Sequence, residues 1–262
     1  MKVRPKKHLG QHFLTDMDVA EKIANTIPKD FPCSKILEIG PGTGVLTQFL
    51  LKNYEQELTV CEIDRESVTY LQLYFPLLHN RIISDDFLKM DLKERFTEPF
   101  ILIGNYPYNI STQIVFKMIE NKELIPLMTG MFQKEVAERI CAGPNSKIYG
   151  ITSVLTQAFY DCEYLFTVDE HVFDPPPKVK SGVIRLTRKE DTSLNCDPKL
   201  FKTLVKTAFG QRRKTVRNAI KSLTGKNEFE HEFLGKRAEN LSYLDFIQLT
   251  NDLQAFLDQQ EK

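Results

Sequence analysis

Two groups of residues in the N-terminal half of the chain have the types and spacing needed for chemistry on a nucleotide. The first is the sequence Glu-Ile-Gly-Pro-Gly-Thr-Gly at residues 38–44, between a short apolar run and a helical pattern. Glycines let the backbone pass close to a ligand where any Cβ would clash. The segment predicts a strand–turn–helix unit that binds a nucleotide cofactor, although a tight turn without a ligand can also use such glycines.

The spacing of these glycines narrows the choice of cofactor. A dinucleotide fingerprint GxGxxG that starts at Gly40 would need glycine at position 45, which is Val45. The GxGxG form that begins with Gly40 and Gly42 is typical of S-adenosylmethionine (SAM) methyltransferases. SAM is therefore the predicted cofactor.

Acidic residues after the next two apolar runs extend the candidate cofactor site. Glu62 follows Gly40 by 22 residues, and a carboxylate at this point can accept hydrogen bonds from both ribose hydroxyls. Asp64 is the alternative acceptor and could instead cap the next helix. Further on, a carboxylate of Asp85 or Asp86 can accept from the adenine amine while Phe87 packs beside the ring, and position alone does not exclude a solvated turn.

The second group is Gly-Asn-Tyr-Pro-Tyr at residues 104–108, a type of sequence that marks methylation at an exocyclic amine. The lone pair of such an amine is delocalised into the ring. The Asn105 side-chain oxygen and the Pro107 carbonyl can each accept one N–H, which favours a pyramidal nitrogen aimed at the methyl donor. Tyr108 can stack on the base, and Phe173 can cover its second face or plug the core. The competing interpretation of the motif is a proline that ends a β-ladder.

These residues must be positioned by a sheet, because short apolar runs alternate with helical patterns as far as residue 186. Such alternation predicts an α/β fold of the Rossmann-like SAM-dependent methyltransferase type, with a mostly parallel sheet covered on both faces. Thr15 with Asp18 resembles a capping box that opens the first helix, and Ser111 can cap another. The predicted strands are residues 35–39, 58–63, 81–84, 100–105, 127–132, 162–168 and 182–186.

Beyond residue 186 only helical patterns appear, so a small C-terminal all-helical domain is expected. The predicted division is a methyltransferase domain at 1–187, a linker at 188–198 and a helical RNA-binding domain at 199–262. One helix is expected at 200–209, a second through Val216 and Leu223, and a last one with Leu244 and Leu253 on its apolar face.

The formal net charge of zero, from 35 basic and 35 acidic residues, hides an uneven distribution. Residues 1–10 carry a net +4, and residues 199–226 carry nine basic side chains and no carboxylate. A block without carboxylates indicates contact with a polyanion, although most charge runs are solvated helix faces. Arg213, Arg217 and Lys221, spaced four apart, are expected to line one helix face. The candidate RNA-binding residues are Arg212, Arg213, Lys214, Arg217 and Lys221.

Other classes of protein are disfavoured by composition. No run of 18 apolar residues predicts a membrane span, and the five widely spaced cysteines and five histidines show no metal-ligand spacing. A cytoplasmic, metal-free monomer is expected.

The motifs together resemble the ribosomal RNA adenine N6-dimethyltransferases, specifically the kasugamycin-susceptibility (KsgA) branch that acts on small-subunit rRNA. The matching segments are residues 7–14, 38–47, 62–64, 85–87, 105–111, 133–139, 173–186 and 209–221. The resemblance implies SAM contacts at His12, Leu14, Gly40, Glu62, Asp86 and Asn105. With the residues chosen from the motifs, the candidate cofactor set is His12, Leu14, Gly40, Gly42, Glu62, Ile63, Asp86, Phe87 and Asn105.

The resemblance also implies a substrate and a partner. These are two adjacent adenosines in a hairpin loop near the 3′ end of 16S rRNA, each methylated twice within the small ribosomal subunit late in its biogenesis. Two residues depart from the family pattern: Tyr106 stands where leucine is common, and His12 where asparagine is common. The alternatives are a large-subunit rRNA methyltransferase that confers antibiotic resistance, a non-catalytic assembly factor, and a DNA adenine methyltransferase.

Overall fold

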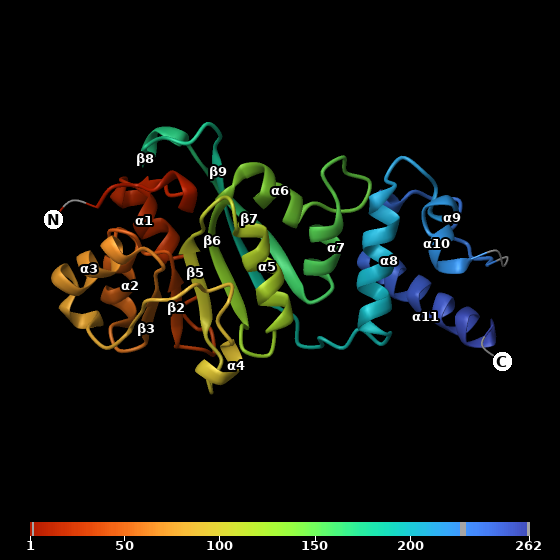
Figure 1. Cartoon of the computed structure of the whole chain (residues 1–262), viewed down its shortest axis with the longest axis horizontal. Helices are drawn as coiled ribbons and strands as arrows, with labels where there is room; N and C mark the ends of the chain where they lie inside the picture. The colour runs from red at the N-terminus through yellow and green to blue at the C-terminus, as the bar shows by residue number, and fades with distance from the viewer. Residues whose placement is uncertain (2, 226–228, 261–262) are drawn as a thin grey trace. The chain divides into compact units, whose positions relative to one another are not determined.

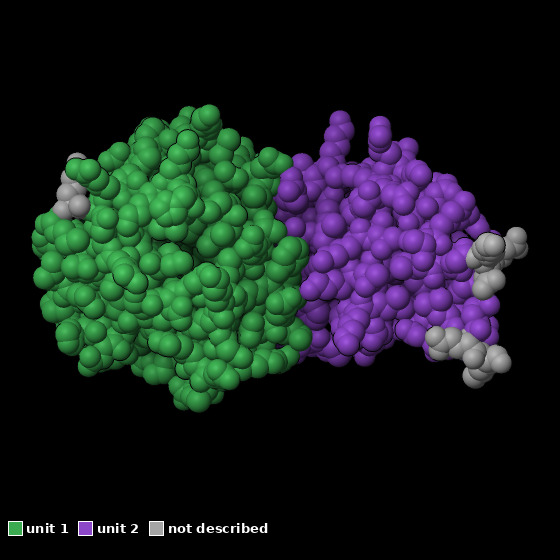
Figure 2. Space-filling view, in the orientation of Figure 1, with its two compact units in different colours: residues 1–138, 161–188 green, residues 139–160, 189–262 purple. Residues whose placement is uncertain are grey.

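A computed structural model describes residues 1, 3–225 and 229–260 of the chain (Figure 1). The chain divides into two compact units, coloured separately in Figure 2. Unit 1 comprises residues 1–138 and 161–188, and unit 2 comprises residues 139–160 and 189–262. Unit 1 ends at residue 188, and the predicted domain boundary is at residue 187. Residues 139–160 differ from the prediction, because they belong to the helical unit.

Unit 1 is built on a seven-stranded sheet with the order β4-β3-β2-β5-β6-β9-β7. The pairs β4–β3, β3–β2, β2–β5 and β5–β6 are parallel, and β9 is antiparallel to β6. All seven predicted strands are present and the mostly parallel sheet is confirmed. The strands are β2 (Ile36–Ile39), β3 (Leu58–Cys61), β4 (Ile82–Ile83), β5 (Ile101–Asn105), β6 (Leu127–Gln133), β7 (Tyr160–Val168) and β9 (Ser181–Arg188).

Central strands of this sheet are buried, which explains why they are continuous apolar runs rather than alternating patterns. Ile101, Leu102 and Ile103 of β5 are all inaccessible to solvent. Helices lie between successive strands along the chain, as a parallel sheet requires. They are α1 (Met17–Ala24), α2 (Thr47–Tyr54), α3 (Arg65–Tyr74), α4 (Leu92–Arg95), α5 (Ser111–Glu120) and α6 (Lys134–Cys141), with the 3-10 turns η1 (Lys7–Leu9), η2 (Pro76–Leu78) and η3 (Glu170–Val172).

The helix caps differ from those predicted in two places. Asp16, not Thr15, caps α1 by accepting the N–H of Val19 at 3.0 Å, and the Thr15 hydroxyl donates to the carbonyl of Val172 instead. Ser111 is the first residue of α5, and its hydroxyl donates backwards to the Tyr108 carbonyl. In both cases the predicted cap residue forms its hydrogen bond with a carbonyl outside the helix.

A two-stranded ladder outside the main sheet joins distant parts of unit 1. β1 (Phe13–Leu14) pairs antiparallel with β8 (Phe173–Asp174). Leu14 lies opposite Phe173, and both side chains are buried. The N-terminal segment is thereby fixed beside the segment that precedes β9.

Unit 2 is helical and includes α7 (Ile151–Gln157), which packs on α8 (Pro198–Gly210). This packing explains why residues 139–160 belong to the helical unit. Residues 189–197, within the predicted linker, form no helix or strand. The remaining elements are α9 (Val216–Ala219), α10 (Lys221–Thr224), η4 (Ala238–Asn240) and α11 (Tyr243–Gln260).

The prediction that Arg213, Arg217 and Lys221 line one helix face is wrong. Arg213 lies in the turn before α9, and Ile220 interrupts the helix between Arg217 and Lys221. The N–H groups of Val216 and Arg217 bond to carbonyls of residues 236 and 234. Residue 226, the last cation of the basic block, lies outside the described residues.

The apolar face predicted for the last helix is also partly wrong. Leu244 is 60% exposed, while α11 buries Phe246, Leu249, Thr250 and Leu253. No helix among the described residues is long and apolar enough to span a membrane. The part of the chain that the structure describes contains no cluster of His, Cys, Asp and Glu suited to a metal ion, and its five cysteines are thiols rather than disulfides.

Candidate functional site

A cavity of about 260 Å³ lies in unit 1, where the carboxyl ends of β2, β3 and β5 meet. Ligands of open parallel sheets bind in this position, outside the carboxyl ends of the strands. The cavity brings together eleven of the residues predicted to bind cofactor or base. They are His12, Leu14, Gly40, Gly42, Glu62, Ile63, Asp86, Phe87, Asn105, Pro107 and Tyr108.

The glycine turn forms one wall of the cavity. Gly40 and Gly42 adopt φ angles of 64° and 56°, a conformation that favours glycine. A Cβ on Gly42 would also lie 2.8 Å from the ring of Phe13. The absence of a side chain at Gly42 therefore serves both its backbone conformation and the close approach of Phe13.

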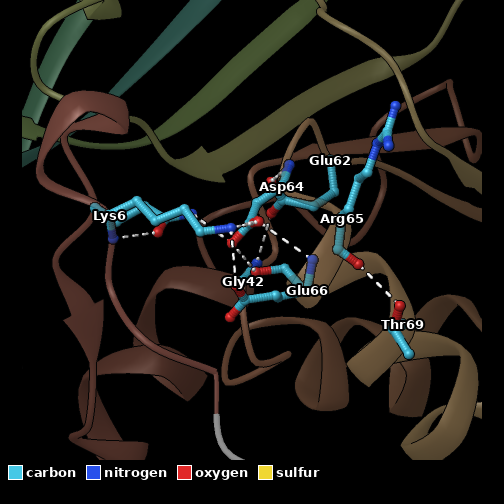
Figure 3. Close-up of polar contacts among 9 residues, drawn as sticks. Lys6, Gly42, Glu62, Asp64, Arg65, Glu66 and Thr69 are labelled. Atoms are coloured by element: carbon cyan, nitrogen blue, oxygen red, sulfur yellow. Dashed lines mark hydrogen bonds and ion pairs between the residues drawn. The ribbon is translucent and has the colours of Figure 1, made fainter.

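Glu62 is held with both carboxylate oxygens in fixed positions. One oxygen accepts the N–H of Gly42 at 3.1 Å, and the other accepts the N–H of Asp64 at 2.9 Å (Figure 3). The side chain is 3% exposed, and this burial raises the pKa of its carboxyl. Each oxygen keeps a further lone pair, so Glu62 can still accept hydrogen bonds from a ligand in the cavity.

Asp64 is a helix cap, the second of the two roles that its position in the sequence allows. It caps α3 by accepting the N–H of Glu66, and it also accepts from the Ser67 hydroxyl. The Lys6 ammonium contacts Asp64 and Glu66, as Figure 3 shows. Asp64 is absent from the cavity wall. Of the two candidates, Glu62 is the one placed to meet a ligand.

The pair Asp86 and Phe87 lies in an ordered turn after β4. Asp86 accepts the N–H of Leu88 at 3.0 Å, and Phe87 is buried. The Lys117 ammonium donates to the carbonyls of Leu88 and Met90, which secures the turn from α5. The turn is thus a built part of the cavity wall rather than a solvated loop.

Asn105 is oriented by the backbone of His12. Its side-chain nitrogen donates to the His12 carbonyl at 3.1 Å. Because a carbonyl can only accept, the amide NH₂ must face His12. No hydrogen bond among the described residues involves the Asn105 side-chain oxygen, which remains an acceptor for a ligand.

The residues that follow Asn105 point in different directions. Tyr106 is buried away from solvent and its hydroxyl donates to the Thr129 carbonyl, so this departure from the family pattern fills the core. The Pro107 carbonyl accepts the N–H of Ile110 at 3.2 Å and keeps one lone pair for a substrate. The backbone of the motif is thus available with Tyr106 in place of the family's leucine.

Tyr108 is restrained on one face by His12. The two rings are stacked with centroids 5.4 Å apart, and the His12 Nδ1 lies 2.8 Å from the Pro175 carbonyl. Nδ1 therefore carries the proton in this contact, because the carbonyl only accepts.

Phe173 does not join the other predicted site residues. Its side chain is 4% exposed and belongs to the apolar core, and it is absent from the cavity wall. Of the two positions predicted for Phe173, covering the base or filling the core, the structure shows the second.

Glu38 also lines the cavity, although it is not one of the predicted site residues. It is 1% exposed, accepts a hydrogen bond from Thr47 at 2.7 Å, and burial raises its pKa to about 8. A carboxylate inside the otherwise apolar run at residues 36–39 is the sequence signal that could have identified it.

Basic side chains predicted to bind RNA fall into two groups. Arg212 is paired with Glu239, and Arg217 forms two hydrogen bonds of 2.7 Å with Glu230. Arg213, Lys214 and Lys221 are exposed, and no ion pair among the described residues involves them. In the basic N-terminal arm, Lys6 is likewise engaged within the protein through Asp64.

Solved structures of similar shape define the class of the fold. A dimethyladenosine transferase from Plasmodium falciparum matches with a TM-score of 0.74 and 23% identity, covering 95% of this chain and 98% of that chain. The 23S rRNA methyltransferase ErmE matches with a TM-score of 0.66 and 24% identity, covering 91% and 99%. Sheet, glycine turn and cavity together define a Rossmann-like α/β methyltransferase fold, as predicted.

Sequence comparisons narrow the class to a family. The family model described as "Ribosomal RNA adenine dimethylase" matches residues 3–255. A protein of Bacteroides fragilis named "Ribosomal RNA small subunit methyltransferase A" is 60% identical over 97% of this chain and 94% of its own length. A protein of Cytophaga hutchinsonii with the same name is 55% identical over 96% and 98%. The chain belongs to the ribosomal RNA adenine dimethylase family, which confirms the resemblance stated above.

Proposed function

We propose that this chain transfers methyl groups from SAM to the N6 amines of two adjacent adenosines near the 3′ end of 16S rRNA, late in small-subunit biogenesis. The observation that carries the proposal is the Asn105 amide, whose NH₂ is engaged by His12 while its oxygen is left as an acceptor at the cavity. Relatives named as small-subunit methyltransferases support the choice of substrate.

The residues of the cavity fit SAM. Both Glu62 and Asp86 line the cavity, and their roles in the proposal are to accept from ribose hydroxyls and from an adenine amine, respectively. Ile63 is 50% exposed beside Glu62, and it offers apolar surface to a ring together with Phe87. When bound, SAM supplies a methyl group on a positively charged sulfur that a nitrogen lone pair can attack.

The chain's own residues orient the target amine. The Asn105 oxygen accepts one N–H of the adenine N6, and the free lone pair of the Pro107 carbonyl accepts the other. Two such hydrogen bonds reduce delocalisation of the nitrogen lone pair into the ring and fix its direction. The base stacks on the face of Tyr108 that His12 leaves uncovered. Because Phe173 is in the core, Tyr108 is the stacking residue on which the proposal rests.

Binding of the small ribosomal subunit is proposed for the exposed cations of the helical unit that form no ion pair with the described residues. Arg213 and Lys214 are exposed in the turn before α9. Such cations supply salt-dependent affinity for an RNA backbone without reading its sequence. The adenosines themselves are then selected by the cavity and by the shape of the small ribosomal subunit.

The test offers labelled SAM with unmethylated small subunits and, separately, with large subunits from the same cells. The proposal expects labelled dimethyladenosine in the small-subunit RNA. Transfer to large-subunit RNA instead would favour the antibiotic-resistance type of enzyme. Absence of transfer to either particle, with SAM bound, would favour a non-catalytic assembly factor.

A further inference from the structure

Tyr108 has a second restraint besides the stacked imidazole of His12. Its hydroxyl oxygen lies 2.5 Å from the hydroxyl oxygen of Ser181, the first residue of β9. Ser181 is fully buried and is absent from the cavity wall. Among the hydrogen bonds of the described residues, its hydroxyl reaches the site through Tyr108, 73 positions earlier in the chain.

The position of Ser181 is itself fixed by the sheet. It pairs with Gln133 of β6 in the antiparallel ladder, and the preceding Lys180 carbonyl accepts the N–H of Lys134 at 2.9 Å. The Lys180 side chain forms an ion pair with Asp169 at 2.5 Å. The Ser181 hydroxyl is thus a rigid point of attachment for the end of the Tyr108 side chain.

Three contacts then define the stacking geometry. His12 limits tilt of the Tyr108 ring, Ser181 limits rotation of its hydroxyl end, and the His12 carbonyl fixes the amide of Asn105. The Tyr108 ring, on which a base would stack, and the Asn105 oxygen, which would accept its N–H, are therefore fixed relative to each other. In methyl transfer, a small misplacement of the nucleophile is costly in rate.

We propose that Ser181 is a positioning residue for methyl transfer, which holds the Tyr108 ring at the height and angle where a stacked adenine presents its amine to Asn105. This inference rests on the proposed function. It concerns the rate of transfer rather than the binding of SAM, because Ser181 does not line the cavity.

The test uses Ser181→Ala and Tyr108→Phe, which remove the same hydrogen bond from its two sides, and the double variant. Each single change is expected to lower kcat on small subunits about three- to tenfold, the loss typical of one hydrogen bond. The double variant is expected to be no slower than the slower single variant, because both changes break one contact. The Kd for SAM, measured by calorimetry, should stay within about twofold of wild type.

Ser153→Ala is the matched control. Ser153 is also fully buried, and its hydroxyl donates to the Arg139 carbonyl in unit 2. This variant is expected to lower the thermal midpoint without changing kcat, as a purely structural serine would.

Outcomes that overturn the inference are distinct from those that overturn the function. A wild-type kcat for Ser181→Ala, or losses that add in the double variant, would show that Ser181 does not act through Tyr108. Absence of methyl transfer by the wild-type chain would overturn the proposed function and this inference together.

Discussion

The cavity of unit 1 and the basic block of unit 2 hold their functional side chains in opposite ways. In the cavity, Glu62, Asn105 and Tyr108 each have a fixed protein partner that sets the direction of their free lone pairs or ring face. In the basic block, Arg213 and Lys214 lie exposed in a turn, and no ion pair among the described residues involves them.

The proposed function accounts for this difference. Orientation of an amine towards a methyl donor depends on fractions of an ångström, so its acceptors must be preorganised. Neutralisation of phosphates depends on charge density, so flexible cations suffice. The comparison predicts that changes in the cavity alter rate at constant RNA binding, whereas changes in the block alter RNA binding at constant rate.

The largest effect is expected for Asn105→Ala. Loss of the amide removes an acceptor that orients the target amine, and we expect methyl transfer to fall by about 10²- to 10³-fold, the usual cost of one preorganised electrostatic contact. Binding of small subunits, measured by filter retention, should be unchanged. A wild-type transfer rate for Asn105→Ala would contradict the proposed role of the amide in orienting the target amine.

Glu62→Gln should weaken SAM binding about tenfold or more. The amide NH₂ would have to face the N–H of Gly42 or of Asp64, which leaves a buried donor unpaired. Calorimetric titration with SAM measures the effect. Asp64→Asn serves as the comparison, because Asp64 caps α3 outside the cavity, and it should lower the thermal midpoint more than the SAM affinity.

The double substitution Arg213→Gln/Lys214→Gln should weaken the binding of small subunits. It should also reduce the steepness with which the logarithm of the association constant falls with the logarithm of the salt concentration, by about 1.4–1.8. SAM affinity should not change. Arg217→Gln is the matched control, because that guanidinium is paired with Glu230, and it should leave the salt slope nearly unchanged. Equal slopes for the double variant and wild type would contradict the division into paired and unpaired cations.

The smallest effect concerns the pH dependence of stability. Burial raises the pKa of Glu38 to about 8 from 4.5, so the folded state binds a proton more tightly than the unfolded state does. The resulting contribution to stability is fully present below about pH 4.5 and is lost as pH rises through 8. Thermal midpoints without SAM should therefore fall less between pH 5 and 9 for Glu38→Gln than for wild type. Parallel profiles would show that Glu38 keeps an ordinary pKa.

The parts of the structure that the sequence could predict depend on local patterns. The apolar runs identify all seven strands of the sheet, and glycine spacing identifies the turn at residues 38–44. Residues at the ends of parallel strands must meet at one edge, which is why nine of the eleven predicted residues line one cavity. The other two, His12 and Leu14, lie in the N-terminal segment outside the main sheet.

The parts that could not be predicted depend on contacts between distant residues. Spacing alone suggests that Arg217 is free, but its partner Glu230 lies 13 residues further along in another segment. Phe173 could equally have been a stacking residue, because only the pairing of β8 with β1 places it in the core. Likewise, the sequence does not show that Lys6 is paired, because its partner Asp64 is distant along the chain and is brought close by the fold.

Reverse-transcription mapping after incubation with SAM and unmethylated small subunits tests the central claim most directly. We expect strong stops at two adjacent adenosines near the 3′ end of 16S rRNA with the wild-type chain. With Asn105→Ala, at equal occupancy of the small subunit and equal incubation time, we expect both stops to be weaker by about 10²- to 10³-fold. Stops at other positions, or the same two stops at wild-type strength with Asn105→Ala, would contradict the central claim.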